Sequence, residues 1–596
     1  MSIQYLEDSW PHKDKTPRPG QLESVDNIIQ EFKDKDYILL LAPPGSGKSL
    51  IAITLANYLN TIFDYGYEDE GDSCDRKSYV LTTEKILQKQ YLDDFSMLPK
   101  VKYLLGKSNY LCNREGAEEG TSYENGICHL LPEKEAKVLP CVQSCSYKCA
   151  RKEARVGKVV ISNYHYMLVD QDFIPDFARM PNKYLTIYDE AHNLEPILLD
   201  YTVVGIGEGL LKEHDKRLNK AILFLENVLP LIDTLKSLYE QIKGLSEDDV
   251  VGAISLFKKI SNWYVEVSTR IDRFVKIEIA KLSDEYVKRG SSIEVYKDDR
   301  FKKFRYCQNF SENLKQANSK ILNMVKSVEE ENSIWVFDRT SDKVELKPVY
   351  ASYLFKSSLD NLSDKKVFMS GTLCSKEVFC KTFNISEDRV GFLELPSLFP
   401  VENRPVYNLA VADMSYSNLS EGLKDCLKWV DLLVDLNPGK KVLIHSGNYN
   451  ITEYISKRSK HKKIMFVPKP DGRQTVVDSF KEAKEGILIS PSLMEGISLD
   501  YDLCRVQIFL KVPYLSLADK RIKVRMKYDP KWYAQQAISK IVQGSCRGVR
   551  HADDTCTTYI LDSCFNGLYA RSKDLFPKWF KDAIKTKEDF ERSLLD

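Results

Sequence analysis

The chain lacks long hydrophobic runs, an excess of charge of either sign, and a signal-type N-terminus. No apolar stretch approaches the roughly 18 residues that cross a bilayer, which argues against a membrane protein. The first residues, MSIQYLEDSWPHKDK, contain no basic segment followed by an apolar run, so secretion is not expected. The 86 basic and 86 acidic residues cancel, so any binding to a polyanion has to come from local basic patches.

The composition is that of a large globular protein. Hydrophobic residues make up 43% of the 596 residues and charged residues 29%, which is enough to bury several cores. Without a secretion signal the 14 cysteines are expected to stay reduced, and clustered cysteines then indicate a metal site more than disulfides. We therefore expect a multidomain cytoplasmic protein, and a nuclear location is also compatible with the sequence.

The segment YILLLAPPGSGKSLIAITLANYL (37–59) joins a strand-like apolar run, a glycine-rich turn and an apolar pattern with helical spacing. This is the context of a phosphate-binding loop, although Ala42 replaces the first glycine of the full pattern. Lys48 would reach the terminal phosphates and Ser49 would supply a hydroxyl to Mg²⁺. The alternative is an ordinary turn before a helix. The predicted ATP-binding residues of the loop are Pro44, Gly45, Ser46, Gly47, Lys48 and Ser49.

A second nucleotide element is expected in YLTIYDEAHNL (184–194), where a buried strand ends in two carboxylates. Asp189 would hold Mg²⁺ directly or through water, and Glu190 would polarise the water that attacks ATP. Taken alone, the same four letters could be the acidic start of any helix. Together with the phosphate-binding loop they indicate an ATPase.

The rest of the chain predicts a second α/β unit and a helical insertion. Four β-rich runs separated by helical stretches predict a parallel sheet: 440–450, 485–498, 504–514 and 555–565. About 180 residues between DEAH and the SGT of MSGTL (369–373) show little that is typical of a sheet. Amphipathic spacing over 227–242 and 260–289 predicts long helices there.

Five cysteines lie within 38 residues: Cys112, Cys128, Cys141, Cys145 and Cys149. Thiolates are soft ligands, and four of them are enough for an iron–sulfur cluster or for zinc. Since residues four apart on a helix share a face, both Cys145 and Cys149 could face one metal. The alternative is a set of small apolar thiols packed in a helical face.

The order of the motifs resembles the XPD/DinG branch of the superfamily 2 helicases. The motifs RPGQ (18–21), the phosphate-binding loop, DEAH, MSGTL and QGSCRGVR (543–550) extend the resemblance over about residues 15–580. It implies an α/β fold with two RecA-like motor domains, an inserted iron–sulfur domain and a helical arch domain. The implied division is motor domain 1 in 1–105, 159–199 and 346–400, the iron–sulfur domain in 106–158, the arch-like domain in 200–345, and motor domain 2 in 401–596.

The resemblance also implies roles for single residues. Gln21 would contact adenine, and Ser370 and Thr372 would couple hydrolysis to the DNA strand. Three residues of the second motor domain would face the γ-phosphate: Gln543, Arg547 and Arg550. The implied cofactors are ATP, Mg²⁺ and a 4Fe-4S cluster.

Two positions depart from the family pattern. Cys546 stands where the family usually has glycine, which affects a tight turn at most. In place of an EGxD pattern, MEGISLDYD (494–502) has Glu495, Gly496 and Ser498, with Asp500 two residues late. Because of the second departure, the family's way of linking ATP to DNA through this motif does not carry over directly to this chain.

Segments around the cysteines match the family's cluster domain. LLGKSNYLC and CSYKCARKEA resemble the approaches to its first and last ligands, with Ser146 in place of proline. The implied ligands are Cys112, Cys128, Cys141 and Cys145, separated by 15, 12 and three residues, with Cys149 left over. A zinc site is the alternative, and so is a cluster in which Cys149 replaces one of the four.

Two basic segments are hypotheses for contacts with single-stranded nucleic acid, because positive charge follows phosphates and aromatic rings stack on unpaired bases. Solvated lysines around core aromatic residues are the alternative. The residues are Lys148, Arg151, Lys152, Arg155 and Lys158 in the first segment, and Lys520, Arg521, Lys523, Arg525, Lys527, Tyr528, Trp532 and Tyr533 in the second.

As the resemblance implies, we expect an ATP-dependent DNA helicase that moves 5′ to 3′ on single-stranded DNA and unwinds forked duplexes as a monomer. The chain starts almost directly at the nucleotide-binding segment, so we expect no fused nuclease module and unwinding without cleavage. One alternative is a nucleic-acid-stimulated ATPase that remodels complexes without processive unwinding. Another is a zinc-bearing RNA helicase.

Overall fold

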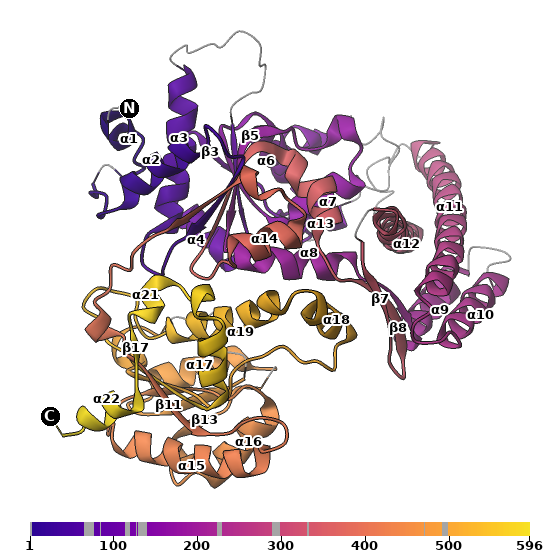
Figure 1. The fold of residues 1–596 in the computed structure, drawn as a ribbon. Coiled ribbons are helices and arrows are strands. Elements are labelled where there is room, and N and C mark those ends of the chain that lie inside the picture. Colours follow the sequence, from indigo (N-terminus) through magenta and orange to yellow (C-terminus); the bar gives the residue numbers. More distant parts are fainter. Residues whose placement is uncertain are drawn as a thin grey trace.

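The computed structural model describes residues 3–12, 14–64, 77–83, 85–113, 120–126, 128, 140–222, 229–288, 298–330, 333–469, 471–491, 497 and 499–595. This part of the chain forms two seven-stranded parallel sheets, each flanked by helices, and a three-stranded antiparallel sheet. The two parallel sheets lie in separate lobes, and a group of long helices projects to one side (Figure 1). The fold class expected from the sequence, α/β with two RecA-like units, is confirmed.

The first parallel sheet has the strand order β10-β1-β9-β5-β2-β4-β3. Helices α2 (Gln21–Glu31), α3 (Lys48–Asp64) and α4 (Lys85–Phe95) share a core with one face, and α7 (Tyr164–Phe173), α8 (Leu194–Thr202) and α14 (Lys376–Phe383) share a core with the other. Both faces are covered, which explains why β1 is an unbroken apolar run. The strands are β1 (Tyr37–Leu41), β2 (Ser78–Thr82), β3 (Val101–Tyr103), β4 (Val159–Asn163), β5 (Lys183–Asp189), β9 (Ser363–Ser370) and β10 (Val390–Glu394).

The strand register brings three motifs to one edge of this sheet. Leu41 of β1 pairs with Ser370 of β9, and Asp189 of β5 pairs with Met369 of β9. The phosphate-binding loop, DEAH and SGT therefore follow the carboxyl ends of three adjacent strands, which is where open α/β sheets bind ligands.

The second parallel sheet has the order β13-β14-β12-β15-β16-β11-β17. Its helices are α15 (Leu419–Asp435), α16 (Tyr449–Arg458), α17 (Arg473–Glu482), α18 (Lys520–Tyr528), α19 (Pro530–Ser545), α20 (Cys564–Arg571), α21 (Lys578–Lys581) and α22 (Lys587–Arg592). All four predicted strands are present as neighbours: β14 (Ile487–Ser490), β12 (Val442–His445), β15 (Val506–Phe509) and β16 (Thr557–Asp562). The remaining strands are β11 (Val406–Ala412), β13 (Met465–Phe466) and β17 (Ile584–Lys585).

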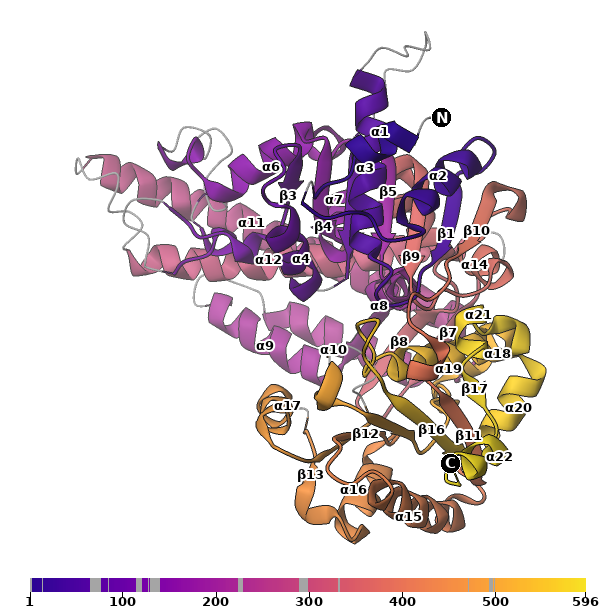
Figure 2. The same cartoon turned by 90° about the vertical axis from the view of Figure 1, so that its left-hand side faces the viewer.

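Long helices make up most of the segment between DEAH and SGT. Helices α9 (Glu208–Ile222), α10 (Leu229–Lys243), α11 (Val250–Lys288) and α12 (Asp299–Val328) share one core and extend away from the first sheet (Figure 2). The predicted helical patterns correspond to α10 and α11. The expectation of little sheet missed a small antiparallel sheet of β6 (Val204–Gly207), β8 (Lys343–Pro348) and β7 (Trp335–Arg339). Strands β7 and β8 are neighbours in the sequence, whereas β6 lies far from its partner β8. Among the described helices, none combines the length and apolar composition of a membrane crossing.

Candidate functional site

The phosphate-binding loop is shaped by two glycines with left-handed backbone. Gly45 has φ 79° and Gly47 has φ 78°, a region that side chains disfavour. A Cβ at Gly47 would lie 2.1 Å from Nε2 of Gln21, and one at Gly45 would lie 2.2 Å from Cζ of Phe399. Gln21 donates from Nε2 to the Ser46 carbonyl at 2.8 Å, so it lies beside the loop, as an adenine-contacting residue must.

Lys48 and the two DEAH carboxylates meet behind this loop. Lys48 Nζ lies 3.3 Å from Glu190 Oε1, and Tyr91 donates its hydroxyl to Asp189 Oδ2 at 3.0 Å. The same Tyr91 hydroxyl interacts with Ser49. The side-chain oxygens of Ser49 and Asp189 therefore lie near one another. Two neighbouring oxygen atoms form an arrangement that suits Mg²⁺. Tyr91 lies in α4, outside every motif, so no sequence pattern pointed to it.

The pKa values of the two carboxyls are shifted in opposite directions. Burial and the adjacent Glu190 raise the pKa of Asp189 to about 6. Burial acts in the same direction on Glu190, but Lys48 and His192 outweigh it and hold its pKa well below the usual value. Glu190 therefore stays ionised, as a residue that accepts a proton from water must.

A chain of hydrogen bonds leads from Glu190 to the second lobe. Ser370 Oγ donates to Glu190 Oε2 at 3.3 Å and lies 2.7 Å from His192 Nδ1. The Thr372 amide donates to Ser370 Oγ at 3.2 Å, and Gln543 Nε2 in α19 donates to Thr372 Oγ1 at 2.8 Å. The structure thus joins the SGT and QGSCRGVR motifs directly.

Residues of both lobes line a cavity of about 470 Å³ between them. Its walls include Pro44, Gly45, Lys48, Glu190, His192, Thr372, Gln543, Cys546, Arg547 and Arg550. Burial and the nearby Arg550 act to lower the pKa of Lys48, but Glu190 and Asp189 outweigh them and raise it. Within the described residues, the buried Arg550 Nε has no hydrogen-bond partner. An anion in the cavity would meet positive charge from both lobes.

The two departures from the family pattern have different outcomes. Cys546 ends α19 with φ −87° and ψ 8°, a conformation that any residue adopts, so glycine is not required there. Glu495, Gly496 and Ser498 lie outside the described residues. Asp500 Oδ2 lies 3.8 Å from His551 Nε2, in the loop that follows Arg550.

Four of the five clustered cysteines lie close together. Burial and the thiols of Cys145, Cys112 and Cys141 raise the pKa of Cys128, against the effect of Lys148. A Cβ on Gly126 would lie 3.6 Å from Cys128 Sγ and 3.7 Å from Cys112 Sγ. In the described part of the chain, however, no three His, Cys, Asp or Glu side chains have an arrangement that would hold a metal ion.

Cys149 is set differently from the other four. It lies in α6 (Ser146–Val156), and its Sγ donates to the Gln143 carbonyl at 3.2 Å. In α6 the arginines are also engaged: Arg151 Nη2 lies 2.6 Å from Asp170 Oδ1, and Arg155 donates to the carbonyls of Ala178 and Arg179. These two arginines hold the helix against the rest of the first lobe.

The second basic segment also packs against protein. Arg525 is fully buried, donates to Thr382 Oγ1 at 2.7 Å, and lies 3.6 Å from Glu195 Oε1. Trp532 is buried too, and its Nε1 donates to Glu195 Oε2 at 2.8 Å. The hypothesis that Arg525 and Trp532 contact nucleic acid is therefore wrong, because both are buried against the first lobe. Lys523, Lys527 and Tyr528 are exposed on the same segment.

Comparisons with known proteins agree with this architecture. Residues 433–583 match a helicase C-terminal domain, and residues 14–196 match the res subunit of type III restriction enzymes. The chain matches no curated protein sequence.

Several solved structures share the fold over almost the whole chain. An XPD helicase structure has a TM-score of 0.60 and 17% identity, and covers 96% of this chain and 100% of its own. An apo XPD structure has a TM-score of 0.56, 17% identity, and coverages of 95% and 100%. S. tokodaii Xpd4 has a TM-score of 0.55, 14% identity, and coverages of 96% and 100%. Part of the second lobe is thus similar to helicase C-terminal domains, and the chain as a whole shares the fold of the XPD structures.

Proposed function

We propose that the chain is an ATP-dependent DNA helicase that moves 5′ to 3′ along single-stranded DNA and opens forked duplexes as a monomer. The observation that carries the proposal is the cavity lined by both lobes. It places Lys48 and Glu190 of the first lobe opposite Gln543 and Arg550 of the second. ATP bound there would draw the lobes together, and its hydrolysis would release them.

In this proposal the carboxylates and the lysine divide the chemistry. Lys48 neutralises charge on the terminal phosphates, and the ionised Glu190 accepts a proton from the attacking water. Asp189 and Ser49 hold Mg²⁺, whose charge would stabilise the phosphate oxygens in the transition state. Gln21 faces the adenine.

The second lobe would contribute only when the cleft is closed. Arg547 and Arg550 supply positive charge to the γ-phosphate from the opposite side, which lowers the barrier to hydrolysis. The bond between Gln543 and Thr372 gives closure a direct connection to Ser370 and Glu190.

The proposal assigns residues 106–158 to a domain with a 4Fe-4S cluster and residues 200–345 to an arch-like domain. Cys112, Cys128, Cys141 and Cys145 are the ligands, supported by their mutual proximity around Cys128. The bound cluster would crosslink four chain segments, so metal binding would stabilise the domain. Zinc on the same thiols is the alternative. Metal analysis that finds about four irons per chain, together with visible absorbance, would identify the cluster.

Duplexes with one single-stranded tail test the polarity. With ATP, the wild-type protein should separate a DNA duplex with a 5′ tail and leave one with a 3′ tail intact, and Lys48→Ala should separate neither. Separation from the 3′ tail only would contradict the polarity. Stronger stimulation of hydrolysis by RNA than by DNA would favour the RNA helicase instead.

A further inference from the structure

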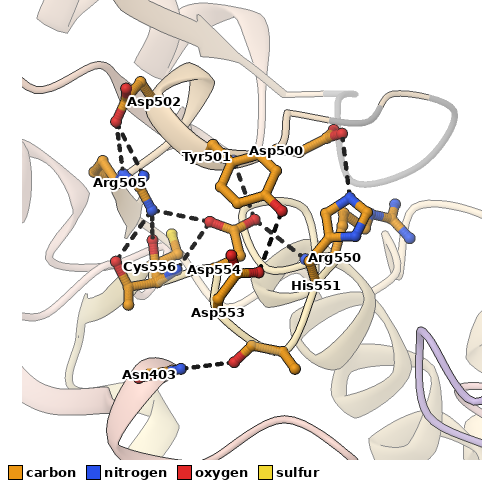
Figure 3. A network of polar contacts seen from close by, with 12 residues as sticks. Asn403, Asp500, Tyr501, Asp502, Arg505, Arg550, His551, Asp553, Asp554 and Cys556 are labelled. Atoms are coloured by element: carbon orange, nitrogen blue, oxygen red, sulfur yellow. Dashed lines mark hydrogen bonds and ion pairs between the residues drawn. The ribbon is translucent and has the colours of Figure 1, made fainter.

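The loop between α19 and β16 contains a carboxylate that is fully enclosed by protein. The Asp554 side chain has an exposed fraction of 0%, whereas its neighbour Asp553 is exposed. Figure 3 shows Asp554 at the centre of a group of side chains that come from distant parts of the second lobe. A buried carboxylate is costly unless several donors surround it.

Four donors from three segments satisfy this carboxylate. Oδ1 accepts from Arg505 Nη1 at 2.9 Å and from the Thr555 amide at 2.8 Å. Oδ2 accepts from the Tyr501 amide at 3.1 Å and from the Arg550 amide at 3.3 Å. Asp554 therefore holds the backbone of Tyr501, the backbone of Arg550 and the base of β15 at one point.

Other contacts fix the same loop from outside. The Tyr501 ring stacks on His551 with centroids 5.1 Å apart and planes 7° apart, and its hydroxyl donates to Asp553 Oδ1 at 3.2 Å. Asn403, in the segment that joins the two lobes, donates from Nδ2 to the Ala552 carbonyl at 2.9 Å. These contacts are more exposed than the Asp554 carboxylate, which is the buried anchor of the loop.

Two of the parts of the chain that Asp554 joins, around Tyr501 and Arg550, lie close to the ATP cavity. Arg550 and Ile497 line it, and Arg547 Nη1 donates to the Ile497 carbonyl at 3.0 Å. Asp554 accepts a hydrogen bond from the backbone amide of Arg550 itself, so it fixes the point from which the Arg550 side chain extends. A shift of that amide would move the guanidinium relative to the phosphates, and an arginine acts in a transition state only when it is aligned.

We propose that Asp554 is the positioning residue for Arg550, holding its backbone so that the guanidinium meets the γ-phosphate when the cleft closes. This inference rests on the proposed role of Arg550 in hydrolysis. Asp554 touches neither ATP nor Mg²⁺, and its effect on turnover passes through the arginine.

A double-mutant cycle tests this dependence through DNA-stimulated ATP hydrolysis by the full chain. Asp554→Asn keeps the shape of the side chain but replaces one carboxylate oxygen by an NH₂ group. This NH₂ group would face N–H donors and could not accept their hydrogen bonds. We expect kcat to fall about 10-fold or more and KM for ATP to change less than about 3-fold. Arg550→Ala should lose about 100-fold or more in kcat, and adding Asp554→Asn to it should cost nothing further. Asp553→Asn is the matched control and should stay within about 2-fold of wild type.

The outcomes separate the two proposals. If Asp554→Asn lowers kcat in the Arg550→Ala background by the same factor as in wild type, the effect is a general structural one, and the positioning role alone is overturned. Unchanged kcat in Asp554→Asn would also overturn the positioning role alone. Wild-type turnover in Arg550→Ala would overturn the proposed role of the arginine and, with it, the positioning role. If thermal unfolding shows that Asp554→Asn does not fold, Asp554→Glu, which keeps the charge opposite Arg505 but displaces it, takes its place in the cycle with the same expectations.

Discussion

Glu190 is held in an unusual backbone conformation at the centre of the site. Its φ of 49° and ψ of 48° lie in the left-handed region, which costs a residue with a side chain about 1 kcal/mol or more. The contacts with Lys48 and Ser370 stabilise this geometry. The conformation lets two consecutive carboxylates serve different partners, Asp189 facing Ser49 and Glu190 facing the cavity.

Glu190→Gln should stop hydrolysis while preserving ATP binding, because the amide keeps the shape but cannot accept a proton from water. We expect kcat to fall by about 100-fold or more. Lys48→Ala should abolish hydrolysis as well. Glu240→Gln, an exposed position in α10, is the control. Steady-state hydrolysis and nucleotide binding measure these effects, and normal turnover in either site variant would refute the assigned pocket.

At the scale of elements, α18 is a joint between the lobes. Arg525 contacts Thr382 in α14 and Glu195 in α8, and α8 follows directly after the DEAH motif. The Arg525 guanidinium also lies 3.8 Å from the ring centre of Tyr350, near β8. Burial raises the pKa of Glu195 even with this cation beside it. The charge of Arg525 therefore opposes the effect of burial and favours the ionised form of Glu195.

Arg525→Met should weaken this joint because it leaves Glu195 buried without its cation, a loss of about 3–5 kcal/mol. Hydrogen exchange in α8 and α14 should become faster. Adding Glu195→Gln should recover part of the protection, since the unpaired charge is removed. Lys527→Met, at an exposed position of the same helix, should change little. Unchanged exchange in Arg525→Met would contradict the role of this ion pair.

The core of the long helices contains a neutral histidine. Burial lowers the pKa of His214 to about 4, and its ring lies among Trp263, Tyr264 and Phe310. In the unfolded chain its pKa is about 6.5. As the pH falls, the unfolded state binds the proton first, so stability is lost between about pH 6.5 and 4.

His214→Phe should therefore reduce the acid sensitivity of the helical insertion. Between pH 7.5 and 5, we expect His214 to cost the wild-type insertion about 2 kcal/mol of unfolding free energy. Hydrogen exchange in α11 and α12, corrected for the intrinsic effect of pH, measures this difference. An equal pH dependence in the variant would assign the sensitivity to other groups.

Local patterns predicted the elements well, and contacts between distant residues escaped prediction. The four strands of the second sheet and helices α10 and α11 follow from apolar periodicity, which is a property of neighbouring residues. In the sheet of β6, β7 and β8, the position of β6 depends on pairing with β8 across more than a hundred residues. The burial of Arg525 and Trp532 likewise depends on Glu195, far away in the chain. Basic and aromatic residues alone could not show whether they face protein or solvent.

At the scale of the whole molecule, the order of motifs predicted the two-lobed fold, and the cavity shows how the motifs meet. The sequence places Gln543 and Thr372 171 residues apart, and only the fold makes them partners. The cluster ligands and the domain limits remain predictions.

Cys112→Ser should separate the functions of the cluster and the motor. We expect loss of bound iron and of strand separation, with part of the ATP hydrolysis retained, because the ATP cavity lies in other segments. Cys149→Ser is the matched control and should keep its iron. Iron analysis and visible spectra of protein purified without oxygen provide the measurement. Unchanged iron in Cys112→Ser would refute the ligand set.

Simultaneous measurement of ATP hydrolysis and strand separation on one DNA duplex with a single 5′ tail tests the central claim most directly. We predict that wild-type protein consumes ATP and separates the strands together, and that Glu190→Gln does neither. Hydrolysis stimulated by this DNA without any strand separation would contradict the helicase and identify an ATPase that remodels complexes.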